Sequence, residues 1–165
     1  SVESHQDARM TIDFDLRKSV VESGNSGKYE LRPTLRLIDD DLSGVISGAV
    51  EQTWLSLPEC SDNDPDTYNA IYVFAGFNVD VDGLDMDSAL YVTSANVQYN
   101  ADSGNYEYEV GFVEAGDYTI ALTCQTDFDR AGVNDNLVYI VSEEVTVNSV
   151  NDADDDDDDE PDIIR

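Results

Sequence analysis

Basic residues are scarce in this sequence. Of its 165 residues, 37 are Asp or Glu and only 8 are Lys or Arg, which gives a formal net charge of −29. A surface this acidic repels phosphate, so neither a nucleic-acid backbone nor an anionic lipid surface is expected as a partner. Long apolar runs are also missing, and no segment is long enough for membrane insertion.

The sequence contains one histidine and two cysteines, and it has no glycine-rich phosphate-binding motif. His5 is the single histidine and lies in a polar opening segment, so a Ser-His-Asp triad is not expected. The two cysteines have no CxxC spacing, and a zinc site therefore lacks ligands. The abundant carboxylates could serve a glycosidase, but their number removes any specificity from that signal. The sequence predicts a protein that is not an enzyme.

The acidic residues are dense at the C-terminus and frequent everywhere else. The last fifteen residues hold nine acids and one base, and the first 150 hold 28 acids and 7 bases. Three interpretations are open. The charge can keep an exported protein soluble, it can reflect adaptation to salt, or it can bind divalent cations through hard oxygen ligands.

An alternating pattern predicts that the chain opens with a β-hairpin. Even-numbered positions are apolar in residues 10–17 and odd-numbered positions in residues 28–37, which is the period-two signature of half-buried strands. Residues 22–27 form a turn-rich connection, and Pro33 predicts an edge position or a bulge because it lacks an N–H. The predicted apolar face consists of Met10, Ile12, Phe14, Leu16, Tyr29, Leu31, Leu35 and Leu37.

A break at residues 39–44 separates this hairpin from the remaining strands. Seven short strands are predicted near residues 45–55, 70–75, 89–99, 105–113, 117–125, 136–141 and 144–148, and no segment has helical periodicity over three turns. This spacing predicts an all-β antiparallel sandwich. The expected organisation is a hairpin extension over residues 1–40, a sandwich over residues 41–150 and an acidic tail over residues 151–165.

The hairpin raises a question about its partner, since an isolated two-stranded hairpin is only marginally stable. Its strands either join the sandwich or complete a sheet that something else supplies. That supplier would be a missing N-terminal domain or another copy of the chain. Strand donation and origin as a proteolytic fragment are both open interpretations.

The two cysteines are predicted to form a disulfide. Counting antiparallel strands places the loop after residue 55 and the loop after residue 125 at the same end of the sandwich, which brings Cys60 near Cys124. Such a bond implies an oxidising compartment. The alternative is a pair of buried free thiols.

Two groups of acidic residues are candidate Ca²⁺ sites. The first combines Asp62, Asp64 and Asp66 with Asp127 and Asp129, which the same strand counting places at one end of the sandwich. The second contains Asp80, Asp82 and Asp85. In this segment Asn78, Asp80, Asp82 and Gly83 match the opening of an EF-hand loop, but the match ends there, because Ala89 stands where the bidentate Glu belongs. The alternative for both is turn formation without an ion.

Four segments resemble known bacterial sequences: residues 11–19, 28–37, 71–76 and 116–125. The first two resemble the closing strands of a bacterial surface lipoprotein family whose domain has no known function. The last two resemble the module that often follows it, which is similar to the carboxypeptidase-regulatory or transthyretin-like β-sandwich. The resemblance implies a transthyretin-like or immunoglobulin-like sandwich and an exported, surface-associated, non-catalytic protein.

These observations predict a structural or adhesive subunit, extracellular or at the cell surface, with the periplasm also open. Residues 10–17 and 28–38 would pair with other copies or with a neighbouring β domain, with Ca²⁺ as the one candidate cofactor. The alternative is a calcium-dependent or carbohydrate-binding surface module. Trp54, Tyr68, Tyr72 and Tyr91 could stack on sugars, although packing within the sandwich is the favoured role for them.

Overall fold

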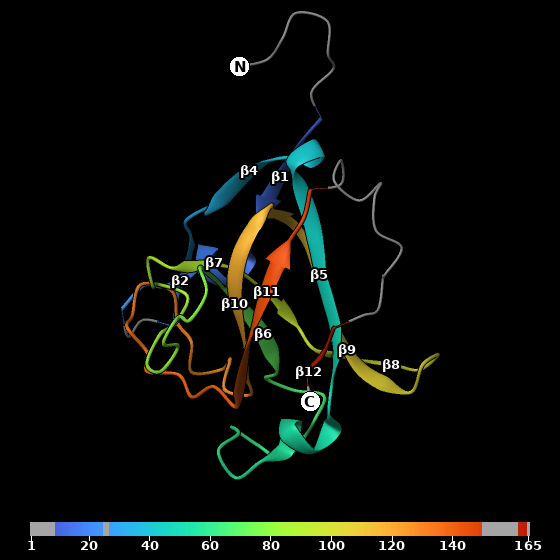
Figure 1. Cartoon of the computed structure of the whole chain (residues 1–165). Coiled ribbons are helices and arrows are strands. Elements are labelled where there is room, and N and C mark those ends of the chain that lie inside the picture. The colour runs from blue at the N-terminus through green and yellow to red at the C-terminus, as the bar shows by residue number, and fades with distance from the viewer. Residues whose placement is uncertain (1–8, 25–26, 150–161, 165) are drawn as a thin grey trace, which may run out of the picture.

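Two four-stranded sheets form the body of the protein (Figure 1). The computed structural model describes residues 9–24, 27–149 and 162–164. The sheets have the orders β11-β10-β6-β7 and β12-β5-β9-β8, and every pair is antiparallel except β12 with β5. The strands are β5 (Ser43–Val50), β6 (Ala70–Ala75), β7 (Tyr91–Asn96), β8 (Gln98–Asn100), β9 (Asn105–Glu114), β10 (Gly116–Thr123), β11 (Val141–Val147) and β12 (Asp162–Ile164). The predicted all-β antiparallel sandwich is confirmed.

The main core lies between these two sheets. Alternate residues of β9, namely Tyr106, Tyr108 and Val110, are buried there, as are Ile120 and Leu122 of β10. This burial explains the period-two pattern in the sequence, because successive side chains of a strand point to opposite faces of the sheet.

The outer face of the β11-β10-β6-β7 sheet is buried as well. Tyr72 and Phe74 of β6 lie on that face and belong to a second core, to which Met86 and Leu137 contribute from two long loops. These loops, residues 76–90 and 124–140, contact one another in Figure 1, and the backbone N–H of Asp135 donates to the carboxylate of Asp85 across 2.6 Å. One sheet is therefore covered on both sides.

Four predicted strands differ from the structure. The strand predicted over residues 45–55 ends at Val50 and is followed by the 3₁₀ helix η2 (Gln52–Ser56). The strand predicted over 89–99 divides into β7 and β8, and the last two predicted strands are replaced by β11 alone. The alternation at residues 136–140 comes instead from a loop that buries Leu137 against the second core.

The opening residues form one hairpin that is interrupted in the middle. β1 (Met10–Phe14) pairs with β4 (Leu35–Asp39), and β2 (Val20–Glu22) pairs with β3 (Tyr29–Leu31). A single turn of helix, α1 (Leu16–Ser19), separates β1 from β2, and the segment with Pro33 separates β3 from β4. The predicted hairpin is therefore present, but the strand expected over residues 28–37, with an edge position or a bulge at Pro33, is divided into β3 and β4.

Local hydrogen bonds explain why the hairpin is interrupted there. The Asp15 carboxylate caps α1 by accepting from the Lys18 N–H at 2.9 Å. The Ser19 hydroxyl accepts from the Thr34 N–H at 2.9 Å, and the Ser19 carbonyl accepts from the Arg32 N–H at 2.7 Å. The 3₁₀ helix η1 (Asp40–Leu42) then leads from β4 into β5.

Two expectations concern residues whose structure is not described. His5 lies outside the described residues, as does most of the acidic tail, from which the structure describes only β12. Among the described helices, none combines the length and the apolar character needed to cross a bilayer.

Candidate assembly surface

The pairing of β1 with β4 determines which hairpin residues share a face. Ile12 lies opposite Leu37, and Phe14 lies opposite Leu35, so these four side chains share one face of the two-stranded sheet. Asp13 lies opposite Arg36 on the other face. The hairpin therefore has one apolar face and one polar face, as the alternation predicts.

The apolar face is exposed in the described structure. Ile12 is 67% exposed and Leu37 is 63% exposed, whereas Ile38 on the opposite face is 1% exposed. The other exposed apolar residues of the hairpin are Met10, Leu16, Val20, Tyr29, Leu31 and Leu35, and Phe14 is half-buried. The body of the chain thus covers the polar face of β1 and β4 and leaves their apolar face uncovered.

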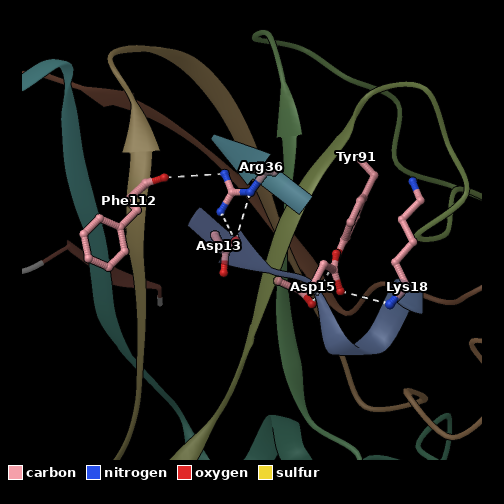
Figure 2. A network of polar contacts seen from close by, with 7 residues as sticks. Asp13, Asp15, Lys18, Arg36, Tyr91 and Phe112 are labelled. Carbon is pink, nitrogen blue, oxygen red and sulfur yellow. Dashed lines mark hydrogen bonds and ion pairs between the residues drawn. The ribbon is translucent and has the colours of Figure 1, made fainter. Parts of the chain in front are cut away.

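Arg36 fastens the polar face to the body (Figure 2). Its Nε and Nη2 donate to Oδ2 of Asp13 at 3.0 and 2.6 Å, and its Nη1 lies 3.5 Å from the carbonyl oxygen of Phe112 in β9. Because this ion pair is largely shielded from solvent, it is screened less than an exposed one. The contact joins the hairpin to the β12-β5-β9-β8 sheet.

A second set of contacts joins α1 to the other sheet. The Tyr91 hydroxyl donates to Oδ2 of Asp15 at 3.0 Å, and Lys18 Nζ lies 5.3 Å from the centre of the Tyr91 ring (Figure 2). Arg17 donates to Asn96 Oδ1 at 2.7 Å and lies 5.8 Å from the centre of the Tyr72 ring. Burial, and then the Asp15 charge, raise the pKa of Tyr91, so it remains a hydrogen-bond donor.

The basic residues of the protein are concentrated on this hairpin. Residues 10–39, from the start of β1 to the end of β4, contain five Lys and Arg residues and five acids, so the hairpin has no net charge. Residues 40–150 contain 21 acids and one base, a net charge of −20.

The exposed apolar area of the hairpin is comparable to the largest apolar patches of monomeric proteins. Full burial of one such side chain stabilises by about 1.5–3 kcal/mol, equivalent to about 60–120 Å² each, and the eight side chains are 42–69% exposed, so together they present roughly 300–550 Å². The largest apolar patch on a typical monomer measures about 300–600 Å² and is often functional. We call these eight residues the hairpin apolar face.

The acidic residues after Cys60 form turns. Thr67 Oγ1 donates to Asp62, the Asp66 N–H donates to Asp64 at 3.0 Å, and the Tyr106 hydroxyl donates to Asp66 at 3.0 Å. The Ser61 hydroxyl donates to Asp127, so the two loops meet at one end of the sandwich as predicted.

The second predicted acidic group lies over the outer face of the β11-β10-β6-β7 sheet. Asp85, 3% exposed, accepts from the Asp135 N–H, and its charge helps to raise the pKa of Asp129, for which burial is the largest cause. Asp80 accepts from the Asp82 N–H at 3.3 Å. The loop of residues 76–90 folds back over the β11-β10-β6-β7 sheet, which strand counting could not predict.

Hydrogen bonds within the turns serve several of these carboxylates without an ion. Within the part of the chain that the structure describes, no three acidic, histidine or cysteine side chains are grouped as metal ligands. Ca²⁺ binding by either loop therefore stays a prediction.

The predicted disulfide is confirmed. Cys60 and Cys124 are bonded, with their Cα atoms 4.9 Å apart, and this bond joins the end of β10 to the loop before β6. Disulfides persist in oxidising environments, which indicates a compartment outside the cytoplasm.

Comparisons with known proteins give no relative for this chain: no family model, no curated protein and no solved structure matches it. The lipoprotein and transthyretin-like resemblances stay predictions.

Proposed function

We propose that this chain is a non-enzymatic structural or adhesive subunit of the extracellular space or cell surface that assembles through its N-terminal hairpin. A second copy supplies the partner sheet, and β1 or β4 extends that sheet by strand addition. Main-chain hydrogen bonds then give affinity, and alternating side chains give specificity. The single observation that carries this proposal is the exposure of the hairpin apolar face while the polar face is fastened to the body.

The charge distribution is compatible with another copy as the partner. The hairpin from β1 to β4 has no net charge, so it is the part of the molecule that an acidic neighbouring copy repels least. Its exposed apolar area of roughly 300–550 Å² would be the centre of an interface, with the polar groups around it supplying the rest of the ~800 Å² per partner of a standard protein–protein interface. Repulsion between acidic bodies limits how closely subunits approach, and divalent cations between them would weaken that repulsion.

Sedimentation analysis of the purified chain tests this proposal. We expect association that increases with protein concentration. The double variant Ile12→Ser/Leu37→Ser should weaken self-association at least about tenfold, because it removes apolar area from the centre of the interface. The matched control is Val45→Ser on β5, which is 59% exposed and lies outside the hairpin.

Two outcomes would contradict the proposal. The wild type could sediment as a monomer at every concentration, or the double variant could associate as strongly as Val45→Ser. Circular dichroism of each variant verifies that the sandwich remains folded.

A further inference from the structure

The outer edge of β5 lacks the protection that edge strands usually have. Natural edge strands carry charged residues or proline, which discourage pairing with another chain. β5 contains neither, although 27% of the chain is charged. On one side β5 pairs with β9, and on the other side the described strands pair with it only through β12, over Gly48–Val50. A Cβ on Gly44 would come within 2.7 Å of the Asn148 carbonyl oxygen, so the accessible edge begins at Val45.

The other sheet edges are better protected. β11 is also an edge strand, and the consecutive residues Glu143 and Glu144 place a charge on each of its two faces. The edge strand β7 is contacted by α1, where Arg17 donates to Asn96. β8 is three residues long, so it offers few main-chain hydrogen bonds. β5 is therefore the described edge at which a partner strand can form the most hydrogen bonds.

The main core is incompletely covered beside this edge. β11 lies next to β5 on this side of the sandwich (Figure 1). Ile140 and two side chains of β11, Val141 and Val145, pack against the core but stay partly exposed. A strand added at β5 lies next to these side chains, so it would bury apolar area of the body in addition to forming main-chain hydrogen bonds.

β12 is a weak occupant of the β5 edge. It is three residues long and pairs in parallel with β5, and parallel pairing is slightly less stable per residue than antiparallel pairing. Residues 152–162 hold nine acids and no base, while residues 40–150 have a net charge of −20. Repulsion between like charges therefore opposes the pairing of β12 with β5. A longer partner strand without net charge would displace it.

The hairpin of a second copy fits this edge in length, charge and polarity. β1 and β4 have five residues each, and the accessible edge has six, from Val45 to Val50. The hairpin has no net charge, so an acidic body repels it less than it repels β12. Arg36 holds the polar face of the hairpin on its own body, which leaves the hairpin apolar face for the partly exposed core residues of the neighbour.

We infer that the β5 edge is the acceptor for the hairpin of a second copy, and that β12 occupies half of this edge in a chain without a partner. This inference rests on the proposed function and identifies the surface of the second copy that the hairpin contacts. Assembly replaces a three-residue pairing within one chain by a longer pairing between two chains. The Val45 side chain lies on the outer face of the sheet, away from the core, so Val45→Ser stays a valid control for the hairpin.

A disulfide between β12 and β5 tests this inference. Ala49 and Ile163 are direct partners in the ladder, and neighbouring strands lie about 4.7–4.9 Å apart, which a disulfide can span. Oxidised Ala49→Cys/Ile163→Cys keeps β12 on the edge. We expect its self-association in sedimentation to be at least about tenfold weaker than that of the matched control, Ala49→Ser/Ile163→Ser. Mass spectrometry and a thiol assay verify the bond, and melting temperatures verify folding.

Weakening β12 should have the opposite effect. Ile163→Gly/Ile164→Gly lowers the strand propensity of β12 without changing its charge. The apparent dissociation constant depends on the fraction of chains whose edge is free, so we expect self-association at least about threefold stronger than that of the wild type. Ala153→Gly is the control, because it lies outside β12 and should associate like the wild type.

Three outcomes would overturn the inference. The locked variant could associate as strongly as its serine control, the glycine variant could associate no more strongly than Ala153→Gly, or the cysteine pair could fail to form a bond. In each case the assembly proposal stands if Ile12→Ser/Leu37→Ser still weakens association, and only the choice of acceptor edge is wrong. A wild type that is monomeric at every concentration contradicts the proposed function and this inference with it.

Discussion

Arg36 shows how one residue can decide the orientation of a hairpin. Its guanidinium bonds Asp13 within the hairpin and reaches the Phe112 carbonyl in the body. An apolar face would ordinarily turn inward, because burying it stabilises the fold. Here the face that carries the Arg36–Asp13 ion pair and the buried Ile38 packs against the body, so the hairpin apolar face remains exposed to solvent.

Replacement of this arginine should loosen the hairpin. We expect Arg36→Ala to lower the free energy of opening of the β1 and β4 amides by about 1 kcal/mol, as measured by hydrogen exchange. Arg32→Ala is the control, because the Arg32–Glu30 pair is exposed and should contribute little. Equal exchange in the two variants would show that Arg36 does not anchor the hairpin.

Asp129 should make the stability of the folded protein depend on pH. Burial, with the Asp85 charge, raises the pKa of Asp129 above its usual 3.8, while the Tyr72 hydroxyl donates to it. As pH rises above 3.8, the unfolded chain releases this proton before the folded chain does. The contribution of Asp129 to the stability of the fold is therefore largest below pH 3.8. It decreases as the pH rises from there to the pKa of Asp129 in the folded protein.

Asp129→Asn removes this titrating group, so the stability of the variant should vary less with pH in this range than the stability of the wild type. The stability of Asp129→Asn relative to the wild type should increase with pH from about 4 upward, by about 1.4 kcal/mol for each unit of pKa elevation. Urea unfolding at several pH values measures the difference, and Asp102→Asn in an exposed turn serves as the control. A difference that does not vary with pH would show that Asp129 titrates normally.

At the scale of elements, β4 packs against the body through one buried apolar side chain, that of Ile38. It lies on the face of the hairpin opposite Leu35 and Leu37. Ile38→Ala should destabilise the hairpin by about 2–5 kcal/mol, since it opens a cavity at a position that is 1% exposed. Ile12→Ala, on the exposed face of β1, should change stability by less than about 0.5 kcal/mol. Hydrogen exchange and urea unfolding measure both, and similar losses would mean that the two faces are equally buried.

The elements also show what the sequence could and could not predict. Alternation predicted both hairpin strands and most sandwich strands, because period two follows directly from strand geometry. It could not say which face turns inward, since that depends on Arg36, Asp13 and the distant Phe112. The burial of Met86 and Leu137 was not predictable either, because loops have no period that marks a covered face.

The sequence predicted only part of the candidate site. Seven of the eight residues of the hairpin apolar face follow from alternation. Val20 was not predicted, because it comes after α1, where the alternation of the first strand stops, and the predicted Phe14 is half-buried. Strand counting predicted the Cys60–Cys124 disulfide, since whether two loops lie at the same end depends only on the number of strands between them. It could not predict that Asp85 lies over the outer face of a sheet, because the loop of residues 76–90 folds back there.

At the scale of the whole molecule, the disulfide is the covalent link with the greatest effect on stability. The bond closes a loop with a sequence separation of 64, which should contribute about 4 kcal/mol in the chain-entropy model. Reduction should therefore lower the melting temperature by roughly 8–16 °C. The Cys60→Ser/Cys124→Ser variant should melt at the reduced temperature with or without reductant, and a wild type unaffected by reductant would contradict this expectation.

The two loops over the β11-β10-β6-β7 sheet change where this protein can tolerate variation. Irregular segments normally accept insertions, because little depends on their backbone. Here residues 76–90 and 124–140 are the outer wall of a core, so a deletion there would empty space around Tyr72 and Phe74. Tags and fusions are better accommodated at the exposed turn of residues 101–104, where the chain reverses between β8 and β9.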